Sequence, residues 1–181
     1  MKQFVKKAIS KFFQLYYMAK FSKELKKMQT ETTIWIVDID NTVAASWQTF
    51  NQNWTSEKER LANIPLLQGS VDYINSRKKE GESIIFLSAR NYFTFDITYE
   101  WLRKYKLVQN KTQLFLVAFP KEKITFIKKA IGKNNKVIYI DDLTYNHEKG
   151  ETKYYSSVIE AVKNLPIEYI DYDTILKLNN R

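Results

Sequence analysis

The sequence predicts an α/β fold with a doubly wound, mostly parallel sheet. Four short apolar runs suited to buried strands occur at residues 34–37, 83–87, 114–119 and 137–140. Segments with helical periodicity separate these runs, and this alternation is typical of βαβ units. The first run, IWIV, has no alternation of polar and apolar residues, which indicates a strand covered on both faces.

The amino-acid composition limits which kinds of metal site and nucleophile the protein can have. The chain has 181 residues, 44% of them hydrophobic, which is enough for one globular domain with its own core. It has no cysteine and one histidine, so disulfides, thiolate nucleophiles, cysteine-ligated zinc and multi-histidine metal sites are excluded. Any metal must be bound by oxygen atoms, which favours Mg²⁺. The lack of cysteine also fits the reducing cytoplasm, where we expect the protein.

Residues 1–30 form a strongly basic segment. They contain eight lysines and one acidic residue, Glu24, so they contribute +7 to the formal net charge of +9. Apolar residues recur at helical spacing and predict a basic amphipathic helix over residues 4–19, which is expected to end or change role near Lys20. The residues of this apolar stripe are Val5, Ala8, Ile9, Phe12, Leu15, Tyr16 and Ala19.

We expect residues 1–30 to be distinct from an α/β domain at 31–181, with a junction near residues 28–32. The sequence leaves three interpretations of the segment open: packing on its own domain, peripheral binding at the inner face of an anionic membrane, or contact with nucleic acid. No stretch is apolar over the roughly 20 residues that a membrane-spanning helix needs.

Helix signals fill the intervals between the apolar runs. A capping box at Ser56 begins a short helix in a small insert at about residues 44–66, and another at Ser157 begins a helix near the C-terminus. Pro120 suits the first position of a helix that ends at Gly132. Further helices are predicted at residues 70–81, 97–105 and 173–178, and a last strand at residues 167–170.

Polar and charged side chains follow each of the four runs. Because the carboxyl ends of parallel strands meet at one edge of a sheet, we expect these side chains to converge there. Four carboxylates at one edge would raise one another's pKa values unless a divalent cation neutralised them, and Mg²⁺ bound there would attract a phosphate. In the alternative interpretation, each aspartate pair only caps a turn. The residues are Asp38 with Asp40, Ser88 with Arg90, Lys121 with Lys123, and Asp141 with Asp142.

The two lysines lie where the first turn of a helix normally prefers acidic residues. A local preference broken at a strand-to-helix junction is typical of a functional site. We expect Lys121 rather than Lys123 to bind the phosphate, because Lys121 lies closer to the end of the strand.

These residues resemble a known family. DIDNT at 38–42, IIFLSAR at 84–90, a lysine at 121 and YIDD at 139–142 resemble, in order, the four motifs of the haloacid dehalogenase (HAD) superfamily of phosphohydrolases. The resemblance covers about residues 33–146 and implies a Rossmann-like core. A response-regulator receiver domain also gathers acids, a hydroxyl and a lysine, but in a different order along the chain.

The resemblance implies a Mg²⁺-dependent phosphomonoester hydrolase. Asp38 would attack phosphorus and form an aspartyl-phosphate. Asp40 would protonate the leaving group and then activate the hydrolytic water. Mg²⁺ would be held by the Asp38 carboxylate, the Asp40 main-chain carbonyl, and Asp141 or Asp142.

The resemblance also implies how the phosphate is bound. Ser88 and Lys121, or less favourably Lys123, would hold the phosphoryl oxygens. Thr42 is expected near the phosphate, where it would steady the loop of the first motif. Arg90 would either contact the substrate, as in similar stretches of polynucleotide phosphatases, or pair with an acid at the surface.

Members of the family usually select substrates with an inserted cap, and here the insert is short. The resemblance therefore implies a minimal-cap enzyme with an open site, suited to a large or surface-presented phosphate such as a glycan or lipid-linked one. Trp47, Phe50 and Trp54 either line the entrance or pin the insert to the core, and His147 is expected to be solvated. A polynucleotide 3′-phosphatase and a non-catalytic binding or scaffold protein remain the alternatives.

Overall fold

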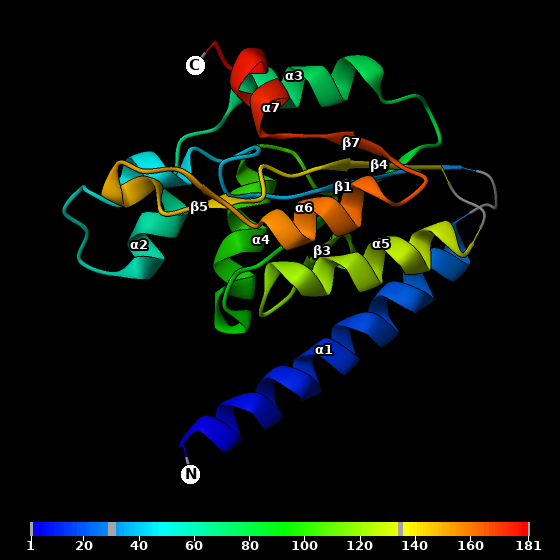
Figure 1. Ribbon diagram of the computed structural model, residues 1–181, viewed down its shortest axis with the longest axis horizontal. Coiled ribbons are helices and arrows are strands. Elements are labelled where there is room, and N and C mark those ends of the chain that lie inside the picture. Colours follow the sequence, from blue (N-terminus) through cyan, green and yellow to red (C-terminus); the bar gives the residue numbers. More distant parts are fainter. Residues whose placement is uncertain (1, 29–31, 134–135, 181) are drawn as a thin grey trace.

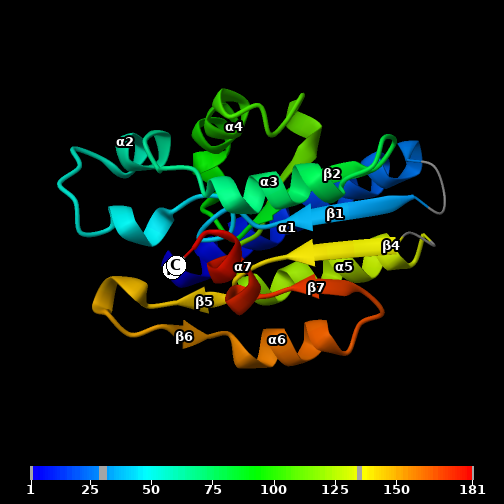
Figure 2. The same ribbon diagram turned by 90° about the horizontal axis from the view of Figure 1, so that it is seen from above.

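The computed structural model describes residues 2–28, 32–133 and 136–180, with side chains from residue 10 onward. Its centre is a five-stranded sheet whose paired neighbours are all parallel, in the order β3-β2-β1-β4-β7 (Figures 1 and 2). The predicted α/β class with a doubly wound parallel sheet is therefore confirmed. The strands are β1 (Thr33–Val37), β2 (Ser83–Ser88), β3 (Leu114–Leu116), β4 (Lys136–Ile140) and β7 (Glu168–Ile170).

Helices cover both faces of this sheet. In Figure 1, α3 and α7 lie on one side of the sheet, and α1, α5 and α6 on the other. None of the described helices is long and apolar enough to cross a membrane. The helices are α1 (Lys2–Lys27), α2 (Glu57–Ala62), α3 (Gln68–Arg77), α4 (Phe95–Lys104), α5 (Lys123–Ile131), α6 (Ser156–Lys163) and α7 (Tyr172–Leu178).

Short elements complete the chain. A hairpin of β5 (Thr144–Tyr145) and β6 (Lys153–Tyr154), which the sequence did not predict, follows β4. The 3₁₀ turns are η1 (Ser46–Thr49), η2 (Tyr92–Thr94), η3 (Lys111–Gln113), η4 (Pro120–Glu122) and η5 (His147–Lys149).

The order of the strands identifies the point where a ligand is expected. From β1 the chain moves outward through β2 to β3, then returns to the other side of β1 to form β4. In doubly wound sheets, ligands bind at the carboxyl ends of the strands where the winding reverses, which here is between β1 and β4. The register pairs Val37, the last residue of β1, with Ile140, the last residue of β4. The residues that follow these two therefore start side by side.

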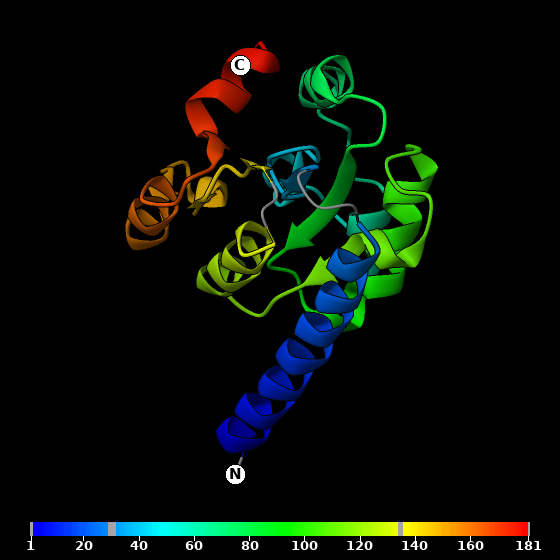
Figure 3. The same ribbon diagram turned by 90° about the vertical axis from the view of Figure 1, so that its right-hand side faces the viewer.

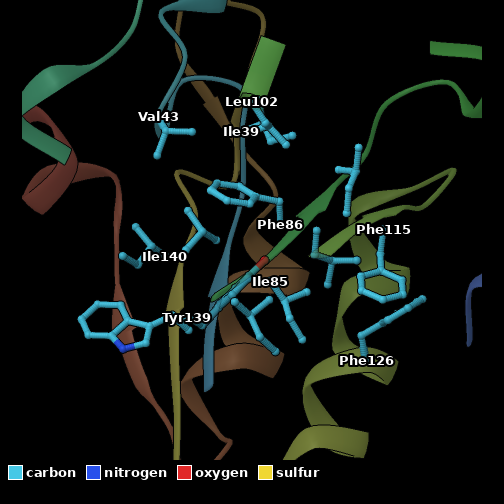
Figure 4. Packing of buried hydrophobic residues seen from close by; sticks show 14 of the residues in the cluster. Ile39, Val43, Ile85, Phe86, Leu102, Phe115, Phe126, Tyr139 and Ile140 are labelled. Atoms are coloured by element: carbon cyan, nitrogen blue, oxygen red, sulfur yellow. The ribbon is translucent and has the colours of Figure 1, made fainter. Parts of the chain in front are cut away.

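The core is built around β1. Residues 34–37 are almost completely buried, which confirms that this strand is covered on both faces. Figure 4 shows Ile85 and Phe86 of β2 among the surrounding side chains, with Phe115 and Phe126 together on the side of α5. A strand held this firmly fixes the backbone of the carboxylates that follow it.

Helix α1 differs from its prediction in length and in the face that packs. It continues past Lys20 to Lys27, and it buries Tyr17, Phe21 and Leu25 against the domain. Lys20 lies within the helix, where its ammonium donates to the Lys111 carbonyl at 2.9 Å and lies near the rings of Phe95 and Phe115. The predicted stripe is not the packed face, since Phe12, Leu15, Tyr16 and Ala19 are exposed. The side chains of Val5, Ala8 and Ile9, and residues 29–31 of the expected junction, lie outside the described parts.

We expect α1 to contribute directly to stability. The ring of Phe21 is fully buried, with its centroid 5.2 Å from that of Phe115 and 5.1 Å from that of Phe126. Phe21→Ala should therefore lower the free energy of unfolding by about 3–5 kcal/mol. Phe12→Ala, the same change on the exposed face, should alter it by less than about 0.5 kcal/mol. Urea unfolding of both variants tests this, and equal effects would show that α1 does not dock as described.

Local capping signals succeeded and failed for identifiable reasons. Ser56 caps α2 as predicted, its hydroxyl accepting a hydrogen bond from the Glu59 amide at 3.1 Å. Ser157 does not cap, because α6 already begins at Ser156 and the capping position is Tyr155. Helix α3 ends at Arg77 rather than at Gly81, which instead occupies a left-handed turn with φ of 83°.

Candidate active site

Two pairs of aspartates follow β1 and β4 at the reversal of the winding. The Asp38 amide donates to the Ile140 carbonyl at 2.8 Å and so continues the β1–β4 ladder by one residue. The Asp141 amide donates to the Ile170 carbonyl of β7 at 3.3 Å. Asp38 and Asp141 are thus held by sheet hydrogen bonds on adjacent strands, and both side chains are buried.

A buried lysine joins these two carboxylates. Lys123 Nζ lies 2.6 Å from Asp38 Oδ1 and 2.7 Å from Asp141 Oδ2, and the lysine is 3% exposed. Burial by itself would lower the pKa of Lys123, but the charges of Asp141 and Asp38 outweigh it and raise the pKa. The lysine is therefore a fixed positive charge at neutral pH.

The carboxylate cluster, Asp38, Asp141 and Asp142, fits a divalent cation. One carboxylate oxygen from each residue lies within 4.8 Å of the others. Burial raises the pKa of Asp38 well above its usual range despite Lys123, and it also raises the pKa of Asp142 despite a hydrogen bond from His147. One lysine cannot neutralise three buried carboxylates, so the cluster favours binding of a further cation. Carboxylate oxygens are ligands that suit Mg²⁺.

The prediction that Lys121 enters the site is wrong. Lys121 is exposed, with its ammonium 5.9 Å from the centroid of the Phe119 ring. The chain passes through the 3₁₀ turn η4 after β3, and α5 begins at Lys123. One further turn of backbone brings Lys123 back over the strand ends, because a 3₁₀ turn takes about three residues. Closeness to the strand in sequence was therefore a poor guide to closeness in space.

Asp40 lies beside this cluster but faces an arginine. Arg90 Nε is 2.7 Å from Asp40 Oδ2, and Arg90 Nη2 is 2.7 Å from Asp40 Oδ1, so the pairing is bidentate. The hydroxyl of Ser46 also donates to Asp40. Of the two roles left open for Arg90, the structure shows pairing with an acid, but Arg90 is buried and does not lie at the surface as expected. Burial alone would raise the pKa of Asp40, but the charge and hydrogen bonds of Arg90 lower it to about 2.

This lowered pKa predicts how Asp40 affects stability as the pH falls. Ionised Asp40 stabilises the fold fully above its unfolded pKa of about 3.9, and this contribution disappears as the pH falls towards about 2. The free energy of unfolding of the wild type should therefore exceed that of Asp40→Asn by a constant amount above about pH 4. The difference should shrink below that pH, which urea unfolding at a series of pH values would measure. A difference that stays constant down to pH 2 would contradict the assigned ion pair.

Ser88 and Thr42 occupy different positions. Ser88 is buried at the end of β2 and lines the same pocket as the carboxylates. Its hydroxyl oxygen Oγ lies 3.4 Å from Asp40 Oδ2. Thr42 is fully buried behind the cluster, where its hydroxyl accepts a hydrogen bond from the Asp142 amide at 3.2 Å. Thr42 thus ties the two aspartate loops together, and it does not line the pocket where phosphate binding was predicted.

His147 was predicted to be solvated, and this is wrong. Its side chain is 6% exposed, and Nε2 lies 2.6 Å from the hydroxyl of Thr144, which also donates to Asp142. The ring stacks on Trp47 with centroids 5.6 Å apart. The unpredicted β5–β6 hairpin brings His147 back to the site, and its two-residue strands are too short to show periodicity in the sequence.

The pocket over these side chains has a volume of about 310 Å³. Phe50 of the insert lines it, with the Arg60 guanidinium 4.3 Å from the ring centroid, so Phe50 is at the entrance as one interpretation expected. Trp54 instead donates to the Thr49 carbonyl at 2.8 Å and holds the insert together. Besides the residues already named, the lining includes Asn41, Ala89, Pro120, Leu143, Tyr145, Asn146, Glu148 and Tyr155.

Comparisons with known proteins add little. No protein-family model and no curated protein matches the chain. Among solved structures, the p-nitrophenyl phosphatase from Archaeoglobus fulgidus aligns with a TM-score of 0.33 and 20% sequence identity, over 79% of this chain and 42% of that chain. The chain thus spans less than half the length of that phosphatase, and so low a TM-score supports no conclusion about activity. What the structure establishes is a parallel α/β fold with a buried cluster of carboxylates and a lysine at its carboxyl edge.

Proposed function

We propose that the protein is a Mg²⁺-dependent phosphomonoester hydrolase of the HAD superfamily that works through an aspartyl-phosphate on Asp38. The observation that carries this proposal is the position of Lys123, 2.6 Å from Asp38 and 2.7 Å from Asp141 at the reversal of the sheet winding. A fixed cation between two carboxylates, beside a pocket lined by a serine hydroxyl, suits phosphoryl transfer, in which catalysis is mostly positioning and charge stabilisation.

The reaction takes place in two steps. A carboxylate oxygen of Asp38 attacks phosphorus, the bond between phosphorus and the ester oxygen breaks, and the leaving group departs and takes up a proton from solvent. Water then attacks the phosphorus of the aspartyl-phosphate while Asp40 accepts a proton from it, and the bond between phosphorus and the Asp38 oxygen breaks. Inorganic phosphate leaves, the Asp38 carboxylate is restored, and Asp40 returns its proton to solvent. Asp38, Asp141 and Asp142 would hold Mg²⁺, which when bound neutralises charge shared by the carboxylates and the phosphate.

The proposal assigns two of the expected roles differently. Lys123, rather than Lys121, is the lysine that would balance the phosphoryl charge, together with Ser88. Arg90 keeps Asp40 ionised, which suits a base in the second step better than an acid in the first. An aryl phosphate, whose leaving group needs little protonation, is therefore a good first assay substrate.

The dimensions of the site bear on the substrate. A pocket of about 310 Å³ is at the lower end of the range for small-molecule sites, so it suits a phosphate and the part of the substrate attached to it. The insert that contributes Phe50 is short. A minimal-cap enzyme of this kind suits a glycan or lipid-linked phosphate, most of which stays outside the pocket.

Two alternatives differ in class. A polynucleotide 3′-phosphatase was suggested partly by Arg90, but this guanidinium is occupied by Asp40, so that argument weakens. A non-catalytic scaffold with this fold would not need Lys123, Asp38 and Asp141 arranged as a buried triad, which is unfavourable to desolvate.

Metal removal tests the proposal. We expect hydrolysis of p-nitrophenyl phosphate in Mg²⁺, a loss of at least about 10²-fold on chelation, and recovery when Mg²⁺ is restored, since a metal supplies several kcal/mol of charge stabilisation. The same assay across sugar, lipid, nucleotide and 3′-phosphorylated oligonucleotide substrates separates the alternatives. Metal-independent hydrolysis would contradict the proposed mechanism, and no hydrolysis of any of these substrates would favour the scaffold.

A further inference from the structure

Helix α1 has a second apolar face that the domain does not cover. Tyr17 and Phe21 are buried against the sheet, whereas the outer face of α1, defined here as Phe12, Leu15, Tyr16 and Ala19, is exposed. Phe12 is 65% exposed and Leu15 62%. These four residues belong to the amphipathic stripe of the sequence. The described part of this stripe therefore faces away from its own domain.

The outer face borders η2 at the carboxyl edge of the sheet through Phe13, whose ring centroid lies 5.7 Å from that of Phe12, and the loop after β3 lies at the same edge. The ring of Phe13 stacks on that of Tyr92 in η2, with centroids 4.6 Å apart, and the ring of Phe93 lies 6.2 Å away. Phe93 is 79% exposed, and Phe119, in the loop after β3, is 54% exposed. Figures 1 and 2 together show that α1 starts on the side where the strands end and runs antiparallel to them. Figure 3 shows that its N-terminal part projects beyond the rest of the domain.

These exposed side chains are concentrated rather than scattered. Of the eight large apolar side chains exposed among the described residues, five lie on the outer face of α1 or on these two loops. Single exposed apolar residues are ordinary, but a group of them marks an interaction surface. We call these five residues, Phe12, Leu15, Tyr16, Phe93 and Phe119, the apolar surface.

Lysines outnumber acids around the apolar surface, where the nearby acids Asp96 and Glu122 bind the Lys111 ammonium and the Ala118 amide. Lys11 and Lys121 are exposed beside Phe12 and Phe119, and the sequence adds Lys2, Lys6 and Lys7. The first acidic residue of the chain is Glu24. Aromatic and aliphatic side chains bordered by lysines suit the headgroup region of an anionic bilayer, where the rings enter the interface and the ammonium groups meet lipid phosphates.

We propose that the apolar surface docks on an anionic lipid bilayer. Two copies of the chain would bring lysine-rich segments together and repel each other, and nucleic acid would leave Leu15 without a suitable contact, since those interfaces are polar. A bilayer satisfies both the apolar and the basic side chains. The helix would lie along the membrane plane through its outer face while its inner face stays on the domain.

Docking on a bilayer would determine which class of substrate reaches the pocket. Pro120, which follows Phe119, lines the pocket, and so does Ala89, which lies shortly before Phe93. Phe119 of the apolar surface is thus bonded directly to a residue of the pocket border, so docking through Phe119 would bring the pocket near the lipid headgroups. If the proposed phosphatase function holds, on which this step rests, the substrate class is a phosphomonoester anchored in the bilayer.

Vesicle flotation tests the docking independently of activity. The full-length wild type, Phe12→Glu/Leu15→Glu and the control Tyr154→Glu would be floated with phosphatidylcholine vesicles with and without phosphatidylglycerol. Tyr154 is an exposed aromatic residue outside the apolar surface, on β6. We expect the wild type and the control to float with anionic vesicles, and the double variant to bind on the order of tenfold more weakly or worse. Equal flotation of all three, flotation that does not need the anionic lipid, or no flotation would overturn the proposal.

Four further measurements make the outcome specific. Thermal unfolding of the double variant should match the wild type, because both residues are exposed. If the double substitution instead changed only self-association in light scattering, or only oligonucleotide binding, the surface would serve another partner and the proposal would fail. For each protein, the rate of hydrolysis of a vesicle-embedded lipid phosphomonoester would be divided by the rate for a soluble aryl phosphate. This ratio should be on the order of tenfold lower in the double variant than in the wild type. Flotation without hydrolysis would reject the phosphatase alone, and hydrolysis without flotation would reject the docking alone.

Discussion

Replacing Lys123 with methionine should destabilise the protein strongly and remove most of its activity. Lys123 is the cation that Asp38 and Asp141 share, and all three side chains are buried. Methionine preserves the apolar stem but leaves two buried carboxylates without their partner. Breaking a buried ion pair in this way costs about 3–5 kcal/mol. Urea unfolding in Mg²⁺-free buffer would measure this loss, because a bound metal would offset it.

Lys121 provides the matched control for this substitution. It lies two residues away, in the same strand-to-helix connection, but its side chain is exposed. Lys121→Met should change the free energy of unfolding by less than about 0.5 kcal/mol. Hydrolysis should fall about 10²–10³-fold for Lys123→Met, as expected for losing one stabilising group of the transition state, and little for Lys121→Met. The reverse pattern would show that the connection after β3 is placed wrongly.

Asp38→Asn should lower hydrolysis of an aryl phosphate by at least about 10³-fold, because the amide cannot act as the nucleophile. The variant should remain folded. The pKa of Asp38 is raised by burial, so in the absence of metal the ionised residue weakens the fold as the pH rises above about 3.9, and asparagine removes this effect. Lys123 keeps Asp141 as a partner.

Asp72→Asn is the control for this change, since Asp72 is an exposed aspartate of α3, and it should retain full activity. Thermal unfolding of both variants at neutral pH separates loss of chemistry from loss of structure. An Asp38→Asn protein that hydrolyses at the wild-type rate would rule out Asp38 as the nucleophile.

The sheet could be predicted from the sequence because its strands are short, apolar and separated by helical patterns. Runs such as 34–37 and 137–140 occupy the two central strands, where burial on both faces leaves little doubt about conformation. Helix α1 was predicted less well, since it carries two apolar faces and periodicity cannot tell which one the domain covers. The tertiary partners Phe115 and Phe126, distant in sequence, decide that.

The site was predictable as far as the strand ends determine it. Asp38, Ser88 and Asp141 follow strands directly, so their meeting at one edge follows from parallel topology. Lys123 and His147 follow from local turns instead: one 3₁₀ turn selects the lysine, and a short hairpin returns the histidine. Neither element leaves a periodic trace in the sequence, which is why both residues were misplaced.

The stereochemical course at phosphorus tests the central claim most directly. A phosphorothioate monoester made chiral at phosphorus with two oxygen isotopes would be hydrolysed by the wild-type enzyme in water enriched in the third isotope, and the configuration of the inorganic thiophosphate product would be determined. Two successive in-line displacements, first by Asp38 and then by water, predict overall retention of configuration. Inversion would mean that water attacks the substrate directly, and it would contradict an aspartyl-phosphate at Asp38.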